Sequence, residues 1–220
     1  MENYIIAIGA IVAAYLIGSI NFAVIFSKIF AGKDVRDSGS GNAGATNTLR
    51  TVGKKAGILT FVFDALKGYA ACAIGKAAFG YVYAATANEL FCSAYGAYIC
   101  CIFVMLGHIY PVFFGFKGGK AVACSVGTFA VCCPIAIILG LTGFVISLLI
   151  SKIVSLSSLI ATVIVVGVSV AYQFLVKGIT YNILPVVIMS LIAGFIVFIK
   201  HKDNIKRLIK GEEKKISSKK

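Results

Sequence analysis

The run PIAIILGLTGFVISLLIS, residues 134–151, contains no charged side chain and begins with a proline. A helix of about this length crosses a hydrocarbon core roughly 30 Å thick. Similar runs recur through the 220 residues, of which 60% are hydrophobic and 13% charged, and the mean hydropathy is +0.97. A soluble domain of this size does not need so many apolar side chains. The composition therefore predicts an all-α integral membrane protein and argues against a soluble one.

About seven membrane-spanning helices are expected, with the amino terminus outside the cell. Their predicted bounds are Tyr4–Phe30, Ala56–Phe79, Glu89–Leu106, Ala121–Cys133, Pro134–Ser151, Ser155–Val176 and Tyr181–Ile199. The fourth helix is short, because a crossing wants about 20 residues. It is expected to tilt, to cross only in part, or to fuse with the fifth. Pro134 favours a break between the two, since proline cannot continue a helix without losing a hydrogen bond.

The basic residues are distributed unevenly about these spans. In this topology every Lys and Arg other than Lys67, Lys76 and Lys177 faces the cytoplasm. Cytoplasmic segments of membrane proteins carry such an excess, so the carboxyl terminus is predicted to be cytoplasmic. No Lys or Arg precedes Lys28, and a cleavable signal peptide needs a basic start. We therefore expect no such peptide.

No repeat or linker divides the chain, which is interpreted as a single polytopic domain, residues 1–220, with a basic cytoplasmic tail over 200–220. The last part of the tail, from Glu212, is expected to fray and to lie on anionic lipid. The net charge of +13 favours an anionic partner. No soluble domain is available to present a groove-reading element, so no nucleic acid partner is expected. Anionic membrane lipid and an anionic substrate remain.

The seven cysteines give no metal-binding spacing. None belongs to a CxxC pair, and most lie in apolar runs: Cys72, Cys92, Cys100, Cys101, Cys124, Cys132 and Cys133. Free cysteine packs as a small buried hydrophobe, which is the role expected here. HExxH is also absent. The sequence therefore predicts no metal and no cofactor.

The first of three polar stretches is SGSGNAGATN, residues 38–47, followed by Arg50. Its glycines fit the dinucleotide-binding spacing G-x-G-x-x-G, but that fingerprint needs a strand before it and a helix after it. Backbone N–H groups of a glycine-rich loop nevertheless cup anions, and an arginine fork suits phosphate. The alternative is a flexible cytoplasmic loop. Candidate ligands are Ser40, Gly41, Asn42, Gly44, Thr46, Asn47 and Arg50.

The second stretch is GHIYPVFFGFKGGK, residues 107–120. Two glycines between two lysines let the backbone approach a ligand closely. Its aromatic residues are expected at the membrane interface. The alternative is a re-entrant loop whose lysines extend toward water. Candidate ligands are His108, Lys117, Gly118, Gly119 and Lys120.

The remaining polar residues are fewer. Asp64 and Lys67 lie three residues apart within a predicted span, where they can pair on one face or serve a substrate. The third stretch is HKDNIKR, residues 201–207. Neither histidine has an acid four or five residues later, so the acyltransferase dyad H-x-x-x-x-D is absent. Ser155 or Ser157 is expected to cap the sixth helix or to serve in its packing, rather than to carry chemistry.

These motifs together resemble the bacterial acyl-phosphate:glycerol-3-phosphate acyltransferases. The resemblance rests on SGNAGATNTLR (40–50), DALKG (64–68), GHIYPVFFGFKGGKAVA (107–123) and HKDNIKR (201–207), in that order over nearly the whole chain. Small departures from the family pattern, as at Ala121 and Cys124, affect the fine shape of the pocket.

The resemblance implies an enzyme of the bacterial plasma membrane that moves a fatty acyl group from acyl phosphate to the sn-1 hydroxyl of glycerol 3-phosphate. The products are lysophosphatidic acid and phosphate, in the first step of phospholipid synthesis. By motif position, Ser40, Arg50 and Lys120 hold substrate phosphate, and His201 and Asn204 complete the pocket, which faces the cytoplasm. Lys67, Ser157, Ser158 and Arg207 are further candidates for substrate binding.

Both substrates are phosphates, so the enzyme mainly needs to hold two anions and align a hydroxyl on a carbonyl. The general base is left open between a substrate phosphate oxygen and one of the histidines, His108 or His201. The alternative function is a transporter or flippase for a phosphorylated solute or lipid. Transporters usually carry inverted repeats and sites at the membrane midplane, whereas these polar groups gather at one surface.

Overall fold

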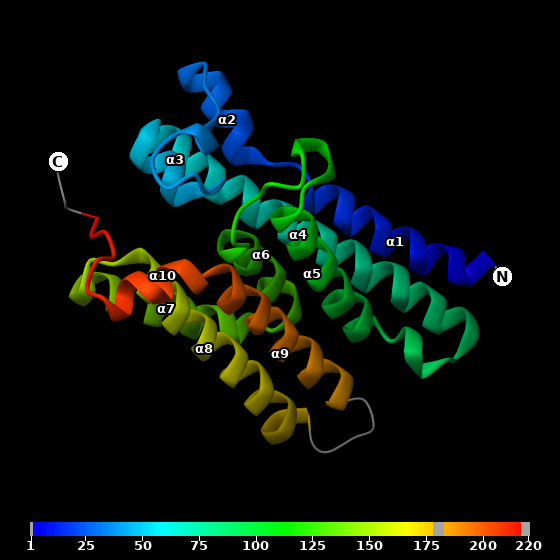
Figure 1. Cartoon of the computed structure of the whole chain (residues 1–220). Coiled ribbons are helices and arrows are strands. Elements are labelled where there is room, and N and C mark those ends of the chain that lie inside the picture. Colours follow the sequence, from blue (N-terminus) through cyan, green and yellow to red (C-terminus); the bar gives the residue numbers. More distant parts are fainter. Residues whose placement is uncertain (1, 178–182, 217–220) are drawn as a thin grey trace. The chain divides into compact units, whose positions relative to one another are not determined.

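The computed structural model describes residues 2–177 and 183–216, and every regular element within them is helical (Figure 1). The helices are α1 (Glu2–Gly18), α2 (Phe22–Ala31), α3 (Ala45–Thr51), α4 (Lys54–Thr86), α5 (Ser93–Ile109), α6 (Val122–Cys132), α7 (Pro134–Ser151), α8 (Val154–Tyr172), α9 (Ile183–Lys200) and α10 (Lys202–Ile209). Three 3₁₀ turns, η1 (Val35–Asp37), η2 (Glu89–Phe91) and η3 (Val112–Phe114), and a π-helical turn, η4 (Gln173–Lys177), complete them.

The chain forms two compact units, Met1–Cys132 and Cys133–Lys220. They are called unit 1 and unit 2. The single domain expected from the sequence stays a prediction.

Six of the described helical segments are long and apolar enough to cross a membrane, and the short fourth helix expected from the sequence is a shorter apolar helix. The seventh, α6, has 11 residues and is about 16 Å long. It does not fuse with α7, because Pro134 occupies the first turn of a new helix. Proline suits that position, where the missing N–H has no partner to lose.

Unit 1 begins with a broken helix, whereas the sequence analysis expected one helix over Tyr4–Phe30. The break lies between α1 and α2, where the Asn21 side chain accepts a hydrogen bond from the Val24 N–H at 3.2 Å. Asparagine is a strong helix N-cap, so it starts α2 afresh within an apolar run. The break leaves the Ile20 carbonyl available to another partner, which proves to be a lysine of α4.

Helix α4 is the centre of unit 1 and packs against α1, α2, α3, α5 and α6. Its 33 residues make it about 50 Å long. Small buried residues, among them Gly68, Ala71, Cys72 and Gly75, lie along it. Small residues let neighbouring helix backbones approach closely inside a membrane.

In unit 2, α7 packs against α8, and α8 packs against α9. Helix α8 starts after Ile153, without a side-chain cap, so neither Ser155 nor Ser157 caps it, and both are buried in the packing of the helix. Ser157 instead donates back to the Ile153 carbonyl at 2.9 Å, four residues earlier. A serine placed inside the first turn bonds in this way rather than capping.

Candidate functional site

The first polar stretch forms a compact loop that is organised by one buried amide. Asn47 Nδ2 donates to the Val35 and Ser38 carbonyls, both at 2.9 Å. Its Oδ1 accepts from the Ser40 N–H, also at 2.9 Å. Both amide hydrogens of Asn47 therefore hold the loop, and the Ser40 side chain, which is exposed, is carried on that fixed backbone.

Gly39 explains why this loop needs glycine. Its φ is +65°, a left-handed conformation that side chains disfavour. A Cβ there would also lie 2.3 Å from Asn47 Oδ1. The loop can therefore close on Asn47 only where residue 39 has no side chain.

The second stretch folds back on the end of α5. The Gly118 N–H donates to the Ile109 carbonyl and the Gly119 N–H to the His108 carbonyl, each at 3.1 Å. A Cβ on Gly119 would lie 2.3 Å from His108 Nε2 and 2.7 Å from the Ala43 carbonyl oxygen. Ala43 belongs to the first stretch, so the two polar stretches touch at Gly119, a contact that the sequence analysis did not predict.

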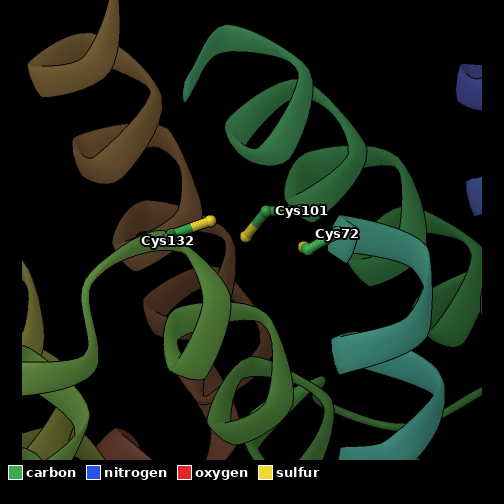
Figure 2. A group of neighbouring side chains, drawn as sticks. All are labelled: Cys72, Cys101 and Cys132. Atoms are coloured by element: carbon green, nitrogen blue, oxygen red, sulfur yellow. The ribbon is translucent and has the colours of Figure 1, made fainter. Parts of the chain in front are cut away.

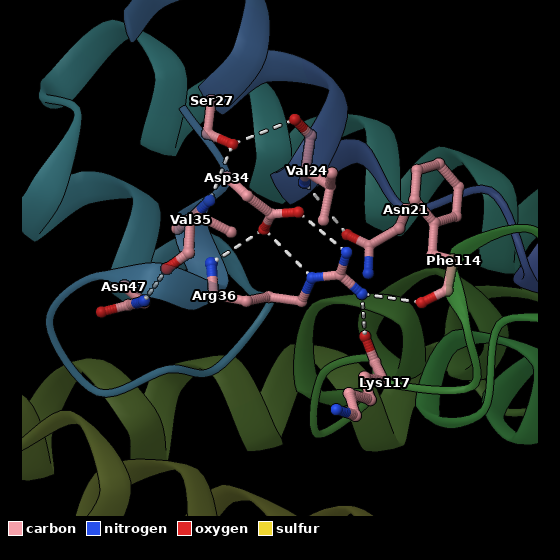
Figure 3. A network of polar contacts seen from close by, with 9 residues as sticks. All are labelled: Asn21, Val24, Ser27, Asp34, Val35, Arg36, Asn47, Phe114 and Lys117. Atoms are coloured by element: carbon pink, nitrogen blue, oxygen red, sulfur yellow. Dashed lines mark hydrogen bonds and ion pairs between the residues drawn. The ribbon is translucent and has the colours of Figure 1, made fainter. Parts of the chain in front are cut away.

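Arg36 fastens the two stretches together (Figure 3). Its guanidinium pairs with Asp34 at 2.8 Å, and its Nη1 donates to the Phe114 carbonyl at 2.7 Å and to the Lys117 carbonyl at 3.2 Å. Phe114 also packs against a small buried cluster that includes Val35. The Arg36 side chain therefore links the segment just before the first polar stretch to two points of the second stretch, at Phe114 and at Lys117.

The Asp34–Arg36 pair stays charged over the physiological range. The side-chain hydrogen bond from Arg36 lowers the pKa of Asp34 below its ordinary value of 3.8, although partial burial opposes the shift. A lowered pKa means that the contact contributes fully above that ordinary value and is lost as the pH falls through the lowered one. The link between the loops is therefore insensitive to pH near neutrality.

Below the loops, three buried ionisable side chains form a cluster. Lys67 Nζ lies 2.9 Å from Asp64 Oδ1 and donates to the Ile20 carbonyl at 2.6 Å. His108 Nδ1 lies 3.5 Å from the same Asp64 oxygen. All three side chains are at most 5% exposed. The predicted Asp64–Lys67 pair is confirmed. Through its hydrogen bond to the Ile20 carbonyl, Lys67 also joins α4 to the break between α1 and α2.

The remaining candidates of unit 1 lie on the outer side of the loops. Ser40, Gly41, Arg50 and Lys117 are exposed, whereas Asn42, Gly44, Thr46, Gly118 and Lys120 are half-buried. Gly44 is the N-terminal flanking residue of α3, and its carbonyl accepts from the Thr48 hydroxyl and N–H. Because Arg50 lies on α3 and Lys120 follows Gly119, both cations are attached to the two loops that Arg36 joins.

Unit 2 holds the third stretch around an acid that the sequence analysis did not select. Glu213 Oε1 accepts from Ser155 at 2.8 Å and from Asn204 at 2.6 Å, and its Oε2 pairs with Arg207 at 2.6 Å. The Ile216 N–H donates to the Lys152 carbonyl at 2.8 Å. The expected frayed end is therefore wrong for residues up to 216, while 217–220 lie outside the described residues.

Other candidates of unit 2 are also buried. His201 precedes α10, is 3% exposed, and its Nδ1 lies 2.8 Å from the Val197 carbonyl. Ser158 donates to the Val154 carbonyl at 2.9 Å. Ser157 lies 3.2 Å from the Ser147 hydroxyl of α7. The unit thus places His201, Asn204 and Arg207 along the length of α10 and holds that helix to α8 through Glu213.

A family model described as glycerol-3-phosphate acyltransferase matches residues 8–211. The chain belongs to the glycerol-3-phosphate acyltransferase family. It is therefore an acyltransferase enzyme, and the transporter alternative is not supported. As a member of this family it carries its four motifs in two units, with the first three motifs in unit 1 and the last in unit 2.

Curated relatives of this acyltransferase cover nearly the whole chain. Glycerol-3-phosphate acyltransferase 2 of Bacillus anthracis is 39% identical over 94% of this chain and 97% of its own. The glycerol-3-phosphate acyltransferase of Clostridioides difficile (strain 630) is 39% identical over 95% of each chain.

Two solved structures of PlsY (YgiH), an integral membrane glycerol 3-phosphate acyltransferase, share the fold of this acyltransferase. The glycerol 3-phosphate form is 32% identical over 96% of each chain, with a TM-score of 0.79. The lysophosphatidic acid form is 31% identical over the same share, with a TM-score of 0.76.

Gly119→Ala tests the contact between the two loops. The added Cβ meets His108 and the Ala43 backbone, and overpacking of this kind costs about 1–3 kcal/mol, so kcat/KM for glycerol 3-phosphate should fall by about tenfold or more. Gly9→Ala is the control, because nothing lies within 4 Å of that position. Initial-rate kinetics on both variants check the prediction, and equal rates would place the loops further apart than described.

Glu213→Gln tests the anchoring of the tail. Losing a charge-assisted contact to Arg207 costs about 1.5–3 kcal/mol, so tryptic cleavage after Lys214 and Lys215 should speed up by about tenfold or more. The matched control is Glu212→Gln, since Glu212 is exposed. Digestion time courses in detergent compare the two, and similar rates would contradict an anchored tail.

The same contact predicts a pH dependence. Burial raises the pKa of Glu213, but hydrogen bonds from Arg207, Ser155 and Asn204 outweigh it and hold the pKa below the ordinary 4.5. Anchoring is therefore complete above about pH 4.5 and is lost as the pH falls through the lowered value. Hydrogen exchange at the Ile216 amide, corrected for its intrinsic pH dependence, should lose protection only in that acidic range.

Proposed function

We propose that this enzyme transfers a fatty acyl group from acyl phosphate to the sn-1 hydroxyl of glycerol 3-phosphate, giving lysophosphatidic acid and inorganic phosphate. Family membership supports the acceptor, and the two related PlsY structures are a glycerol 3-phosphate form and a lysophosphatidic acid form. The observation that carries the proposal is the joining of the two polar loops by Arg36. That link brings cations and backbone N–H groups from both loops to one end of unit 1, as an enzyme for two phosphate substrates requires.

In this proposal Ser40, Arg50 and Lys120 hold substrate phosphate. Arg50 offers a planar fork of donors that matches phosphate oxygens, and Lys120 supplies a point charge. Gly41, Asn42, Gly44, Thr46, Lys117, Gly118 and Gly119 form the surrounding loop surface. Asn47, Lys67 and His108 act from behind that surface, because their contacts fix the loops and the helices beneath them.

Within unit 2, His201 and Asn204 are proposed to take part in substrate binding, together with Arg207, Ser157 and Ser158. Glu213 supports this group by holding the Asn204 amide at one of its oxygens and Arg207 at the other. Its role is to position these side chains, since a carboxylate next to a phosphate substrate would repel it.

The chemistry needs little covalent help from the protein. An acyl phosphate is a mixed anhydride. The acceptor oxygen attacks the acyl carbon, the bond between that carbon and the bridging oxygen breaks, and phosphate leaves with the electron pair. Alignment of the two substrates contributes up to about 7–11 kcal/mol in the best intramolecular cases. We propose that a substrate phosphate oxygen takes the hydroxyl proton, because His108 is buried beside Asp64 and Lys67.

The orientation proposed from the charge distribution places the amino terminus outside and the polar loops and the tail in the cytoplasm of a bacterium. This arrangement needs an odd number of crossings, so the short helix α6 has to count as one in addition to the six long spans. The site then faces the cytoplasm from a multi-pass protein of the plasma membrane.

The donor is tested directly on purified enzyme in detergent. Glycerol 3-phosphate is supplied with palmitoyl phosphate or, in parallel, with palmitoyl-CoA, and phosphate release and lysophosphatidic acid are followed. Product from palmitoyl phosphate alone is expected. Product from palmitoyl-CoA would overturn the donor assignment, and product from neither donor would overturn the function.

The proton acceptor is tested by replacing His108 and His201 with Gln one at a time. Under substrate-assisted catalysis, either change should act mainly on KM. Both variants should keep the dependence of kcat on pH that arises from titration of the substrate phosphate. A loss in kcat of about 10²–10⁴-fold with little change in KM, seen for one histidine only, would identify that residue as the general base.

A further inference from the structure

Three cysteine side chains from three helices of unit 1 meet at one place. Cys72 lies on α4, Cys101 on α5, and Cys132 is the last residue of α6. Their sulfur atoms all lie within 4.8 Å of one another, and Figure 2 shows them pointing together from the three helices. The sequence analysis expected no metal site, because the three cysteines are far apart in the chain and form no recognisable spacing.

A fourth sulfur adjoins the group. Met105 Sδ lies 3.8 Å from Cys101 Sγ, one helical turn along α5, and both residues are fully buried. Thiolate and thioether sulfurs are soft ligands, and their combination favours Cu(I). Metal–sulfur bonds of about 2.3 Å set three ligand sulfurs of a planar site about 4 Å apart, so only small side-chain movements are needed to close around an ion.

Charge selects among the soft metal ions. Helices α4 and α5 are candidate membrane spans, where an uncompensated charge is costly. The charges of Asp64 and Lys67 on α4 already balance each other. Zn(II) held by three thiolates carries a net negative charge. A Cu(I) ion that replaces one thiol proton forms a sulfur–copper bond, releases the proton to solvent and leaves the centre neutral, with no electron transferred.

We propose that Cys72, Cys101, Cys132 and Met105 form a binding site for one Cu(I) ion that ties α4, α5 and α6 together. Helix α5 carries His108 near its end, and α6 begins at Val122, two residues after Lys120. The ion therefore links α5 and α6, the two helices that the second polar stretch connects. This site is independent of the proposed acyl transfer and takes no part in its chemistry.

The test uses the full chain in detergent under anaerobic conditions, with Cu(I) supplied from bicinchoninate as a competing chelator. One Cu(I) per chain is expected, together with a raised apparent Tm. Cys72→Ser, Cys101→Ser and Cys132→Ser should each abolish both effects, and Met105→Leu should weaken binding by about tenfold. Cys100→Ser is the matched control, since Cys100 is equally buried and adjacent in sequence.

Each outcome decides the proposal. Absence of Cu(I) binding, or binding that survives in Cys101→Ser, overturns the site, and tighter binding of Zn(II) overturns the choice of ion. Acyl transfer by the metal-free variants shows that they are folded. If Cys101→Ser lacks that activity, Cys132→Ser and Met105→Leu decide. Inactivity of the unaltered chain with intact Cu(I) binding would count against the acyl transfer proposal alone.

Discussion

Arg50→Ala is expected to lower kcat/KM by about 10²–10³-fold, the loss that follows removal of one preorganised donor from a developing or transferred anion. Arg50 lies on α3, directly after the loop that Asn47 and Gly39 hold closed, and its side chain is exposed. A cation on a short helix that follows a fixed loop needs little reorganisation when phosphate binds. Steady-state kinetics with glycerol 3-phosphate and palmitoyl phosphate measure the effect.

Two further variants separate charge from geometry. Arg50→Lys keeps the charge but loses the planar fork, so its kcat/KM should fall between those of Arg50→Ala and the unaltered enzyme. Lys54→Ala removes a positive charge from an exposed position four residues later and should change kcat/KM by no more than about twofold. Equal losses in Arg50→Ala and Lys54→Ala would mean that only the general field of the surface matters.

Asp64→Leu is expected to destabilise unit 1 by about 3–5 kcal/mol, because it leaves the Lys67 ammonium buried without its carboxylate. The Ile20 carbonyl remains as a partner for Lys67 but cannot neutralise its charge. For a chain of this size the loss corresponds to a fall in apparent Tm of about 10 °C. Thermal unfolding in one detergent, at one scan rate, measures it.

The double variant Asp64→Leu with Lys67→Met decides whether the pair is needed for stability. Replacing both partners of a buried ion pair by apolar residues is often neutral, so most of the lost Tm should return. Asp37→Asn is the control, because that acid is exposed. A double variant as unstable as Asp64→Leu would show that the cost comes from packing around residue 64 and not from the unpaired lysine.

The apolar runs of the long helices were predictable, because hydropathy is a local property that is summed over a run. The contact between the first two polar stretches was not predicted, because it depends on how the helices pack. The break after α1 was missed because a single side chain, Asn21, outweighs an otherwise continuous apolar run. The length of α6 was foreseen as a difficulty, and Pro134 gave the correct boundary with α7.

The missed residues all act through distant partners. Arg36 had no visible task in the sequence, because it binds backbone carbonyls of residues 114 and 117, which are not distinguished by their side chains. Glu213 was assigned to a solvated tail, although it is an acid in a basic segment whose partners include Asn204 and Arg207. The cysteine cluster needs three helices to be placed before it exists.

The way Arg36 binds also bears on how this enzyme can change over evolutionary time. Its two acceptors on the second loop are main-chain carbonyls, at Phe114 and Lys117, which every amino acid provides. Substitutions on that loop at positions other than Phe114, Gly118 and Gly119 can therefore accumulate without removing these two hydrogen bonds. Side chains that point away from these contacts can then change while the hydrogen bonds between Arg36 and the loop backbone stay in place.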